Sequence, residues 1–171
     1  CSLLIQGGAT GINVSTYPSE DADMLAAEAQ YCAMEAELQQ YLDTYESTHD
    51  YDEYHFELDD IEHDPYVLIS AVTALMGREW TLSGGVLEML FEKQYILTET
   101  VTTETRYRTE TRTGYYTDAE GNLHSYEYTV QVPYTYYICT VKLENFNLSH
   151  VPVYIMSQDQ LSLYAMYMAT L

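Results

Sequence analysis

Basic residues are scarce in this chain of 171 amino acids, in which six Lys and Arg stand against 27 Asp and Glu, for a formal net charge of −21. A surface with this balance repels phosphates and anionic headgroups, which argues against nucleic-acid binding and a polybasic membrane anchor. Long hydrophobic runs are also missing, since the longest fall short of the roughly 18 apolar residues that predict a membrane span. The length suits one domain.

Cysteine is nearly as scarce. The three cysteines are Cys1, Cys32 and Cys139, and no C-x-x-C pair occurs. An odd count without such pairs predicts a fold that disulfides do not hold together. We interpret Cys32 and Cys139 as small buried apolar residues, and Cys1 as either a truncation point or the lipidated first residue of a mature protein.

The sequence signatures of catalysis and metal binding are missing too. There is no G-x-S-x-G elbow, and the Gly7-Gly8 and Gly84-Gly85 pairs lack the lysine of a phosphate loop. Residues 43–64 hold ten carboxylates and three histidines, but neither a calcium loop nor an H-E-x-x-H motif. We therefore predict no catalytic residue, metal or cofactor, and a solvated acidic surface. A calcium-responsive segment over residues 50–64 is the weaker alternative.

What the sequence does contain is clear periodicity. Residues 1–18 are uncharged and aperiodic, which indicates a lead-in segment before a single domain over residues 19–171. Residues 19–46 follow a strict heptad pattern typical of a long helix, either packed within its own chain or paired with a second copy as a homodimer through the Met24–Tyr45 stripe. The apolar or small residues of this stripe are Met24, Ala27, Tyr31, Met34, Leu38, Tyr41 and Tyr45.

Three further helices are predicted. Asp64 and Pro65 form an N-terminal cap before an apolar stretch that ends at Gly77. A short helix covers residues 84–94. A last helix begins at the capping-box sequence of residues 157–160 and extends to Leu171.

The remaining segments alternate with a period of two, as strands do. A short strand covers residues 54–58, and a long one, from about residue 95, turns at 117–122 and returns over 124–132. Pro133 is expected to break the ladder before a further strand at 134–144. The fold class is therefore α+β, with helices on one face of an antiparallel sheet of about four strands. Whether the sheet curls round a pocket, as in cystatin-like and NTF-like folds, stays open.

Tyrosine is abundant, with 19 residues that crowd the hairpin region. Its ring gives rigid amphipathic contact area and is favoured at recognition surfaces, although tyrosine also serves simply as a strand former. The candidate binding residues are Tyr115, Tyr116, Tyr126, Tyr128 and Tyr136.

Four stretches, residues 15–56, 61–77, 90–114 and 136–168, carry a family resemblance; its most specific parts are HDPYVLIS at 63–70 and F-x-x-QY at 91–95. They resemble the extracytoplasmic middle region of a mobile-element protein of integrative conjugative elements in Gram-positive gut bacteria. In that family a membrane segment precedes this region and an NlpC-type cell-wall hydrolase domain follows it. The peptidase motif has no counterpart here, because Cys32 follows Tyr31 within a helix and Cys139 lies in a strand pattern.

The resemblance implies a non-catalytic domain on the extracytoplasmic face of the membrane or the cell surface. Its partners would be conjugation or secretion machinery, or cell-wall components, with no nucleic acid among them. The domain would position a hydrolase at the envelope. The alternative is a module that binds peptidoglycan or another ligand through the tyrosines of the hairpin.

Overall fold

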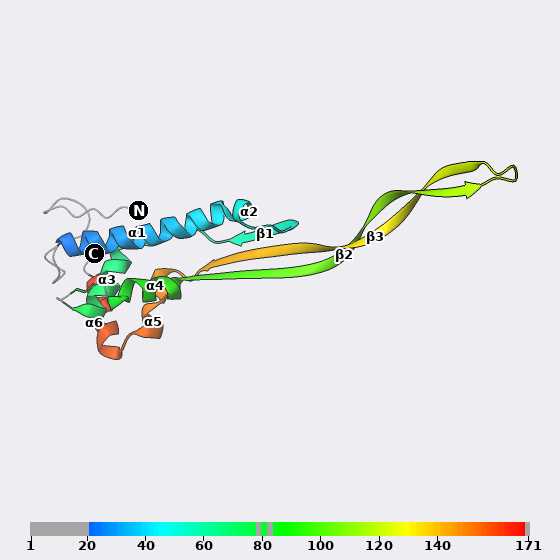
Figure 1. Cartoon of the computed structure of the whole chain (residues 1–171). Coiled ribbons are helices and arrows are strands. Elements are labelled where there is room, and N and C mark those ends of the chain that lie inside the picture. The colour runs from blue at the N-terminus through cyan, green and yellow to red at the C-terminus, as the bar shows by residue number, and fades with distance from the viewer. Residues whose placement is uncertain (1–20, 78–79, 82–83, 170–171) are drawn as a thin grey trace.

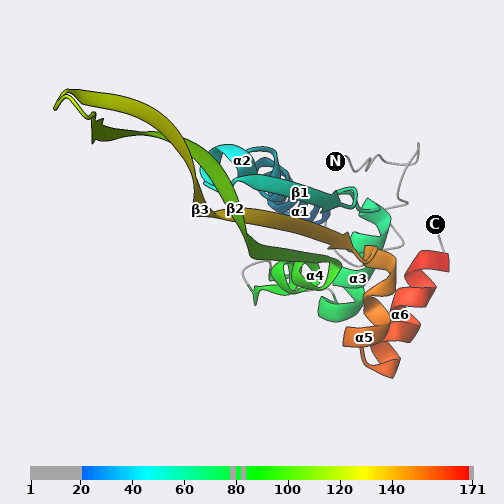
Figure 2. The same ribbon diagram turned by 90° about the vertical axis from the view of Figure 1, so that its right-hand side faces the viewer.

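A computed structural model describes residues 21–77, 80–81 and 84–169. The expected lead-in segment, the start of the first helix and the choice between two origins for Cys1 fall outside these residues. Figures 1 and 2 show a body of helices around the base of a sheet, from which two strands extend far beyond the rest of the chain. In chain order the elements are α1 (Asp21–Asp43), α2 (Tyr45–Thr48), β1 (Glu53–Leu58), α3 (Pro65–Met76), α4 (Val86–Gln94), β2 (Tyr95–Thr117), β3 (Leu123–Asn145), η3 (Leu148–His150), α5 (Pro152–Ile155) and α6 (Gln158–Ala169).

The α+β class is confirmed, but the strand arrangement differs from the expected antiparallel sheet. The described residues form one sheet of three strands in the order β1-β3-β2, not about four strands. β2 and β3 pair antiparallel over their full 23 residues, whereas β1 pairs parallel to β3 alone, with Glu53 opposite Ile138 and Leu58 opposite Leu143. A parallel pair needs a long crossover, which here contains α3, α4 and β2.

The break expected at Pro133 is wrong, because β3 continues through this residue, which pairs with Tyr107. The backbone N–H of Asp52 donates to the Tyr137 carbonyl, and that of Asp59 donates to the Leu143 carbonyl. Odd residues of β3 therefore direct their backbone groups away from β2. The N–H that Pro133 lacks would point to an open edge, where proline is tolerated.

The helix predictions hold where the structure describes them, except that the single helix expected to residue 46 is divided at Thr44 into α1 and α2. The Asp64 side chain accepts a hydrogen bond from the Tyr66 N–H, and Gly77 ends α3 with a positive φ of 70°. At the start of α6 the capping box is closed in both directions. The Ser157 N–H donates to the Gln160 side chain at 2.9 Å, and the Gln160 N–H donates to Ser157 Oγ at 3.2 Å.

The core lies between the helices and one face of the sheet base. It combines Met24 and Tyr31 of α1 with the almost wholly buried α3, with Leu87 and Leu90 of α4, and with the odd-numbered face of β3. On that face Cys139, Val141 and Leu143 are buried, as expected for Cys139. The heptad stripe is thus largely covered within its own chain. The homodimer through this helix stays a prediction, and it would require these residues to leave the core.

We define the arm as residues 103–137, the part of the β2–β3 hairpin that extends past Glu53, the first residue of β1, which pairs with Ile138. Each of its strands has 15 residues, or about 50 Å at the usual strand rise. No helix lies along it in either view (Figures 1 and 2). Five acidic residues and three arginines give it a formal charge of −2, so −19 of the chain's −21 falls elsewhere.

Candidate functional site

The two faces of the arm carry different side chains. Paired residues of β2 and β3 have numbers that sum to 240 throughout, so even residues of both strands share one face and odd residues share the other. The even face combines the charged residues of β2 with tyrosines of β3, as where Arg112 lies opposite Tyr128. The odd face is rich in threonine and carries Tyr107, Tyr115 and Tyr137.

Aromatic rings form a continuous row on the even face near the tip of the arm. His124 stacks on Tyr116 with ring centroids 5.1 Å apart, Tyr116 lies 6.2 Å from Tyr126, and Tyr126 lies 5.8 Å from Tyr128. We call these four residues the ring ladder. Its three tyrosines are 42–52% exposed, so about half of their surface is available to a partner.

A glycine makes room for the centre of this ladder. Gly114 is paired with Tyr126, and a Cβ at position 114 would lie within 3 Å of three atoms of the Tyr126 side chain. The Tyr126 side chain therefore lies against the β2 backbone at a site that only glycine leaves free. Such an aromatic–glycine pair stabilises a strand at a residue that otherwise weakens it.

The turn at the tip is held by one aspartate. Asp118 Oδ1 accepts hydrogen bonds from the N–H groups of Glu120 and Asn122, while its Oδ2 contacts His124 Nε2 at 2.6 Å. The hydrogen bond with His124 is the main cause of the lowered pKa of Asp118. The last ring of the ladder is thus tied to the turn, which orders the tip.

The five predicted tyrosines do not form one surface. Tyr116, Tyr126 and Tyr128 come together in the ladder, whereas Tyr115 projects from the opposite face. Tyr136 is half-buried near the base of the arm. There the guanidinium carbon of Arg106 lies 3.5 Å from the centre of the Tyr136 ring, and the Tyr136 hydroxyl donates to Glu53 Oε1.

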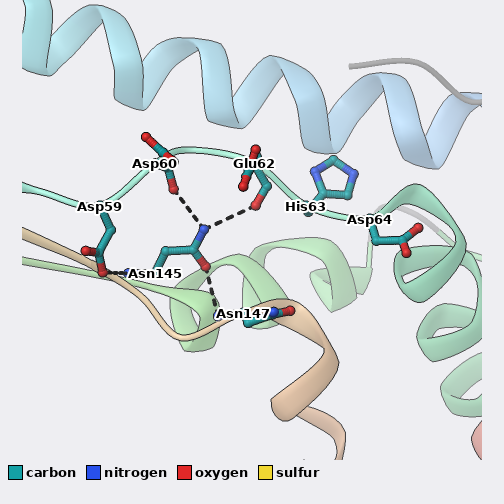
Figure 3. A pocket seen from close by; sticks show the side chains of 7 residues that line it. All are labelled: Asp59, Asp60, Glu62, His63, Asp64, Asn145 and Asn147. Atoms are coloured by element: carbon teal, nitrogen blue, oxygen red, sulfur yellow. Dashed lines mark hydrogen bonds between the residues drawn. The ribbon is translucent and has the colours of Figure 1, made fainter.

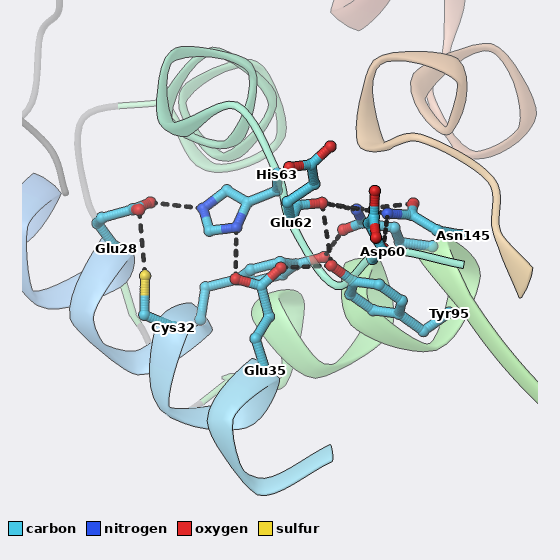
Figure 4. A network of polar contacts seen from close by, with 10 residues as sticks. Glu28, Cys32, Glu35, Asp60, Glu62, His63, Tyr95 and Asn145 are labelled. Atoms are coloured by element: carbon cyan, nitrogen blue, oxygen red, sulfur yellow. Dashed lines mark hydrogen bonds and ion pairs between the residues drawn. The ribbon is translucent and has the colours of Figure 1, made fainter. Parts of the chain in front are cut away.

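A buried polar network, which sequence reasoning missed, lies inside the body (Figure 4). His63 Nε2 lies 2.8 Å from a carboxylate oxygen of Glu28, and His63 Nδ1 lies 2.7 Å from one of Glu35. The three side chains are at most 6% exposed. Burial alone would lower the pKa of His63, but the hydrogen bonds and negative charges of the two glutamates outweigh it and raise that pKa to about 9. His63 is therefore an imidazolium at neutral pH and donates to both carboxylates.

The network continues to the start of β2 and the end of β3. The Tyr95 hydroxyl donates to Glu35, and that of Tyr31 donates to Gln94 at 2.5 Å. Burial is the largest cause of the raised pKa of each tyrosine, and nearby glutamate adds to it. Gln94 Nε2 in turn donates to the side chain of Asn145 at 3.1 Å.

Asn145 fastens the segment between β1 and α3. Its Nδ2 donates to the backbone carbonyls of Asp60 and Glu62, and its N–H donates to Asp59 Oδ2 (Figure 3). The acidic hollow in this figure, lined by Asp59, Asp60, Glu62, His63, Asp64, Asn145 and Asn147, thus includes groups already engaged in hydrogen bonds. This arrangement holds α1, β3 and the intervening segment together.

The network also brings together a sulfur, an imidazole and a carboxylate, the set a cysteine hydrolase needs. Cys32 Sγ lies 3.2 Å from Glu28 Oε1, and their ligand atoms lie within 4.8 Å of His63. However, the sulfur of Cys32 is disulfide-bonded and the residue is half-buried, which corrects the interpretation of Cys32 as a buried apolar residue in a fold that disulfides do not hold together. A disulfide sulfur is neither a nucleophilic thiolate nor a normal metal ligand. His63 is 1% exposed, and each of its ring nitrogens already contacts a glutamate carboxylate.

The spacing of two glutamates in α1 indicates this network from the sequence. Glu28 and Glu35 are seven residues apart, so they lie on one side of α1 beside the stripe residues Ala27 and Met34. Charged residues next to a core stripe need a partner, and a protonated histidine is one side chain that can serve. The two most specific stretches of the family resemblance supply His63 and the Gln94–Tyr95 pair.

Comparisons with protein-family models, with curated proteins and with solved structures give no match for this chain. Among the described residues, no helix has both the length and the apolar character required to cross a bilayer. The family resemblance therefore rests on the sequence stretches alone.

Proposed function

We propose that this chain is a non-catalytic interaction domain whose arm is its contact surface. One observation carries the proposal: residues 103–137 form a two-stranded ribbon that no other described element covers (Figure 1). An isolated two-stranded ribbon is only marginally stable in water. A ribbon of this length that presents eight tyrosines is best explained by a partner that covers part of it.

The family resemblance supplies a context for this proposal. The domain would stand on the extracytoplasmic face of a Gram-positive membrane and position an NlpC-type hydrolase against conjugation machinery. The distribution of charge supports the arm as the contact surface. The strongly acidic body repels anionic surfaces, whereas the nearly neutral arm carries three of the chain's six Lys and Arg residues. A cystatin-like or NTF-like relationship would have to accommodate three strands and an uncovered arm.

The second candidate is binding to the glycan of peptidoglycan. The ring ladder favours it, because exposed aromatic faces at 5–6 Å spacing give a platform for stacking against sugar rings. Both candidates use the same side chains. They differ in whether the target is a protein or the wall polymer.

Binding to the Gram-positive envelope, before and after removal of its proteins, separates the two candidates. We expect the whole chain to bind the intact envelope and to lose binding when proteins are stripped from it. Undiminished binding to stripped sacculi would establish the glycan candidate instead. The combined variant Tyr116→Ala, Tyr126→Ala and Tyr128→Ala should bind at least tenfold more weakly. Tyr154→Ala, at an 84% exposed site in the body, is the matched control.

The non-catalytic part of the proposal has its own test. Purified chain incubated with peptidoglycan should release no more soluble fragments than buffer does. Sustained turnover that is lost in His63→Gln would show that the buried network is reached by substrate, and the proposal would then be wrong.

A further inference from the structure

β2 leaves a long backbone edge without a partner. It is the outermost strand in the order β1-β3-β2, and its register with β3 is unbroken over 23 residues. Within the described part of the chain, no hydrogen bond reaches the backbone of residues 103–117 except from β3. Proteins normally shorten, bend or cover such an edge, because it is a template for pairing with another strand.

The direction of the free backbone groups follows from β3. Odd residues of β3, such as Tyr137 and Leu143, direct their carbonyls away from β2. In an antiparallel ladder the odd residues of β2 opposite them also direct their N–H and C=O outward. A new strand at this edge would therefore form hydrogen bonds with odd residues. The even, charged residues would occupy the non-hydrogen-bonded positions, where facing side chains are closest.

The charges along this edge would match those of a second copy that runs antiparallel to it. Glu104, Arg106, Arg108, Glu110 and Arg112 lie at alternate positions of β2. When two antiparallel copies are centred on Arg108, Glu104 faces Arg112 and Arg106 faces Glu110, in both directions. Only the central Arg108 faces a like charge.

Neighbouring registers lose this match. Centring on residue 107 places Glu104 against Glu110 and Arg106 against Arg108. Centring on residue 109 places Arg108 against Glu110, but it also places Arg106 against Arg112 and leaves Glu104 against Gly114. Opposite charges directly across a strand pair stabilise it and like charges destabilise it, so one register is selected.

We propose that β2 is a homodimerisation edge, at which a second copy of this chain adds antiparallel in the register centred on Arg108. The ladder would then run through four strands, β3-β2-β2-β3. On the odd face it places Val101, which is 43% exposed, opposite Tyr115, which is 65% exposed, so that each is partly covered. The two acidic bodies lie at opposite ends of the shared arm, which minimises their repulsion.

This dimer uses the edge of the arm, so it goes beyond the proposed function and leaves the ring ladder available. Sedimentation equilibrium of the whole chain should show a reversible monomer–dimer equilibrium. Glu104→Arg turns two attractive pairs into repulsive ones and should raise the dissociation constant about tenfold. Arg112→Glu does the same in this register, but centring on residue 109 would place its new glutamate against Arg106, so its dimer should form in that shifted register. Arg112 and Glu104 are about half exposed, at 54% and 46%, so folding of the body should be unchanged.

Mixing gives the decisive result. An equimolar mixture of the Arg112→Glu and Glu104→Arg chains restores every opposite-charge pair in the heterodimer, and so does the double variant with itself. Both should recover the affinity of the unaltered chain. Failure of the mixture and the double variant to recover would overturn the proposed register.

Two further variants test the centre of the dimer. Arg108→Thr removes the one repulsive pair and should tighten the dimer several-fold. Arg108→Cys should form a disulfide between copies under mild oxidation, whereas Thr102→Cys, about 40 Å from its counterpart in this register, should not. Monomers alone at all concentrations, or cross-linking that is equal at both positions, would overturn the proposal.

Discussion

The body and the arm are built from one chain by opposite means. The body buries a core and closes it with a network of charged and polar side chains, whereas the arm has no core and is held by one uninterrupted backbone ladder. Nearly all of the net charge lies on the body, and the arm is close to neutral. Under the proposed function, stability depends on the body and recognition on the arm. Changes in the body should alter folding, and changes in the arm should alter contacts.

The largest expected effect comes from His63→Ala. It leaves Glu28 and Glu35 buried without their cation, and loss of one member of a buried charged cluster costs about 3–5 kcal/mol. Urea denaturation followed by circular dichroism measures the loss. Replacing all three with apolar residues of similar size should recover much of it, and a loss under 1 kcal/mol in His63→Ala would contradict the role of the network.

The second prediction is a dependence of body stability on pH. The pKa of His63 rises from 6.5 to about 9 on folding, so its contribution is complete below pH 6.5 and is lost as pH rises through 9. A shift of this size corresponds to about 3 kcal/mol. The melting temperature should fall over this range in the unaltered chain. A profile of the same slope in His63→Gln would assign the dependence to other groups.

A smaller effect is expected from Gly114→Ala in the arm. The new Cβ collides with the ring of Tyr126 and must displace it from the ladder. The near-ultraviolet dichroism of the tyrosines and hydrogen exchange near the tip should change, while the unfolding free energy of the body changes by less than about 1 kcal/mol. If hydrogen-exchange protection fell equally in the arm and the body, the two regions would unfold as one unit.

The smallest effect is expected from Pro133→Thr. The N–H that it restores points to the open edge of β3, so no ladder bond is gained or lost. Thermal unfolding should differ by less than about 0.5 kcal/mol. A large stabilisation would place the N–H of residue 133 toward β2 and contradict the direction deduced for the odd residues.

Local patterns predicted the helices well, because caps and periodicity are properties of adjacent residues. The Asp64 cap, the Gly77 end and the capping box at residue 157 are all present. Strand pairing could not be predicted in the same way. β1 lies beside a strand 85 residues later in the chain. The six residues of β1 indicate neither which strand it pairs with nor that the pairing is parallel.

The candidate sites show the same limit. Tyr116, Tyr126 and Tyr128 gather only because the register places Gly114 under Tyr126, and this register was not available from the tyrosines alone. Glu28 and Glu35 are 35 and 28 residues, respectively, from His63, which they contact. The expected break at Pro133 failed because its effect depends on which edge its nitrogen faces.

The parallel pairing of β1 with β3 also constrains the order in which the protein can form during synthesis. Residues 53–58 leave the ribosome long before residues 138–143, so the hairpin must be complete before β1 gains a neighbour. Asn145, which fastens the segment after β1, arrives two residues later still. A nascent chain halted inside the hairpin should therefore have its first helices but stay sensitive to proteases until the returning strand emerges.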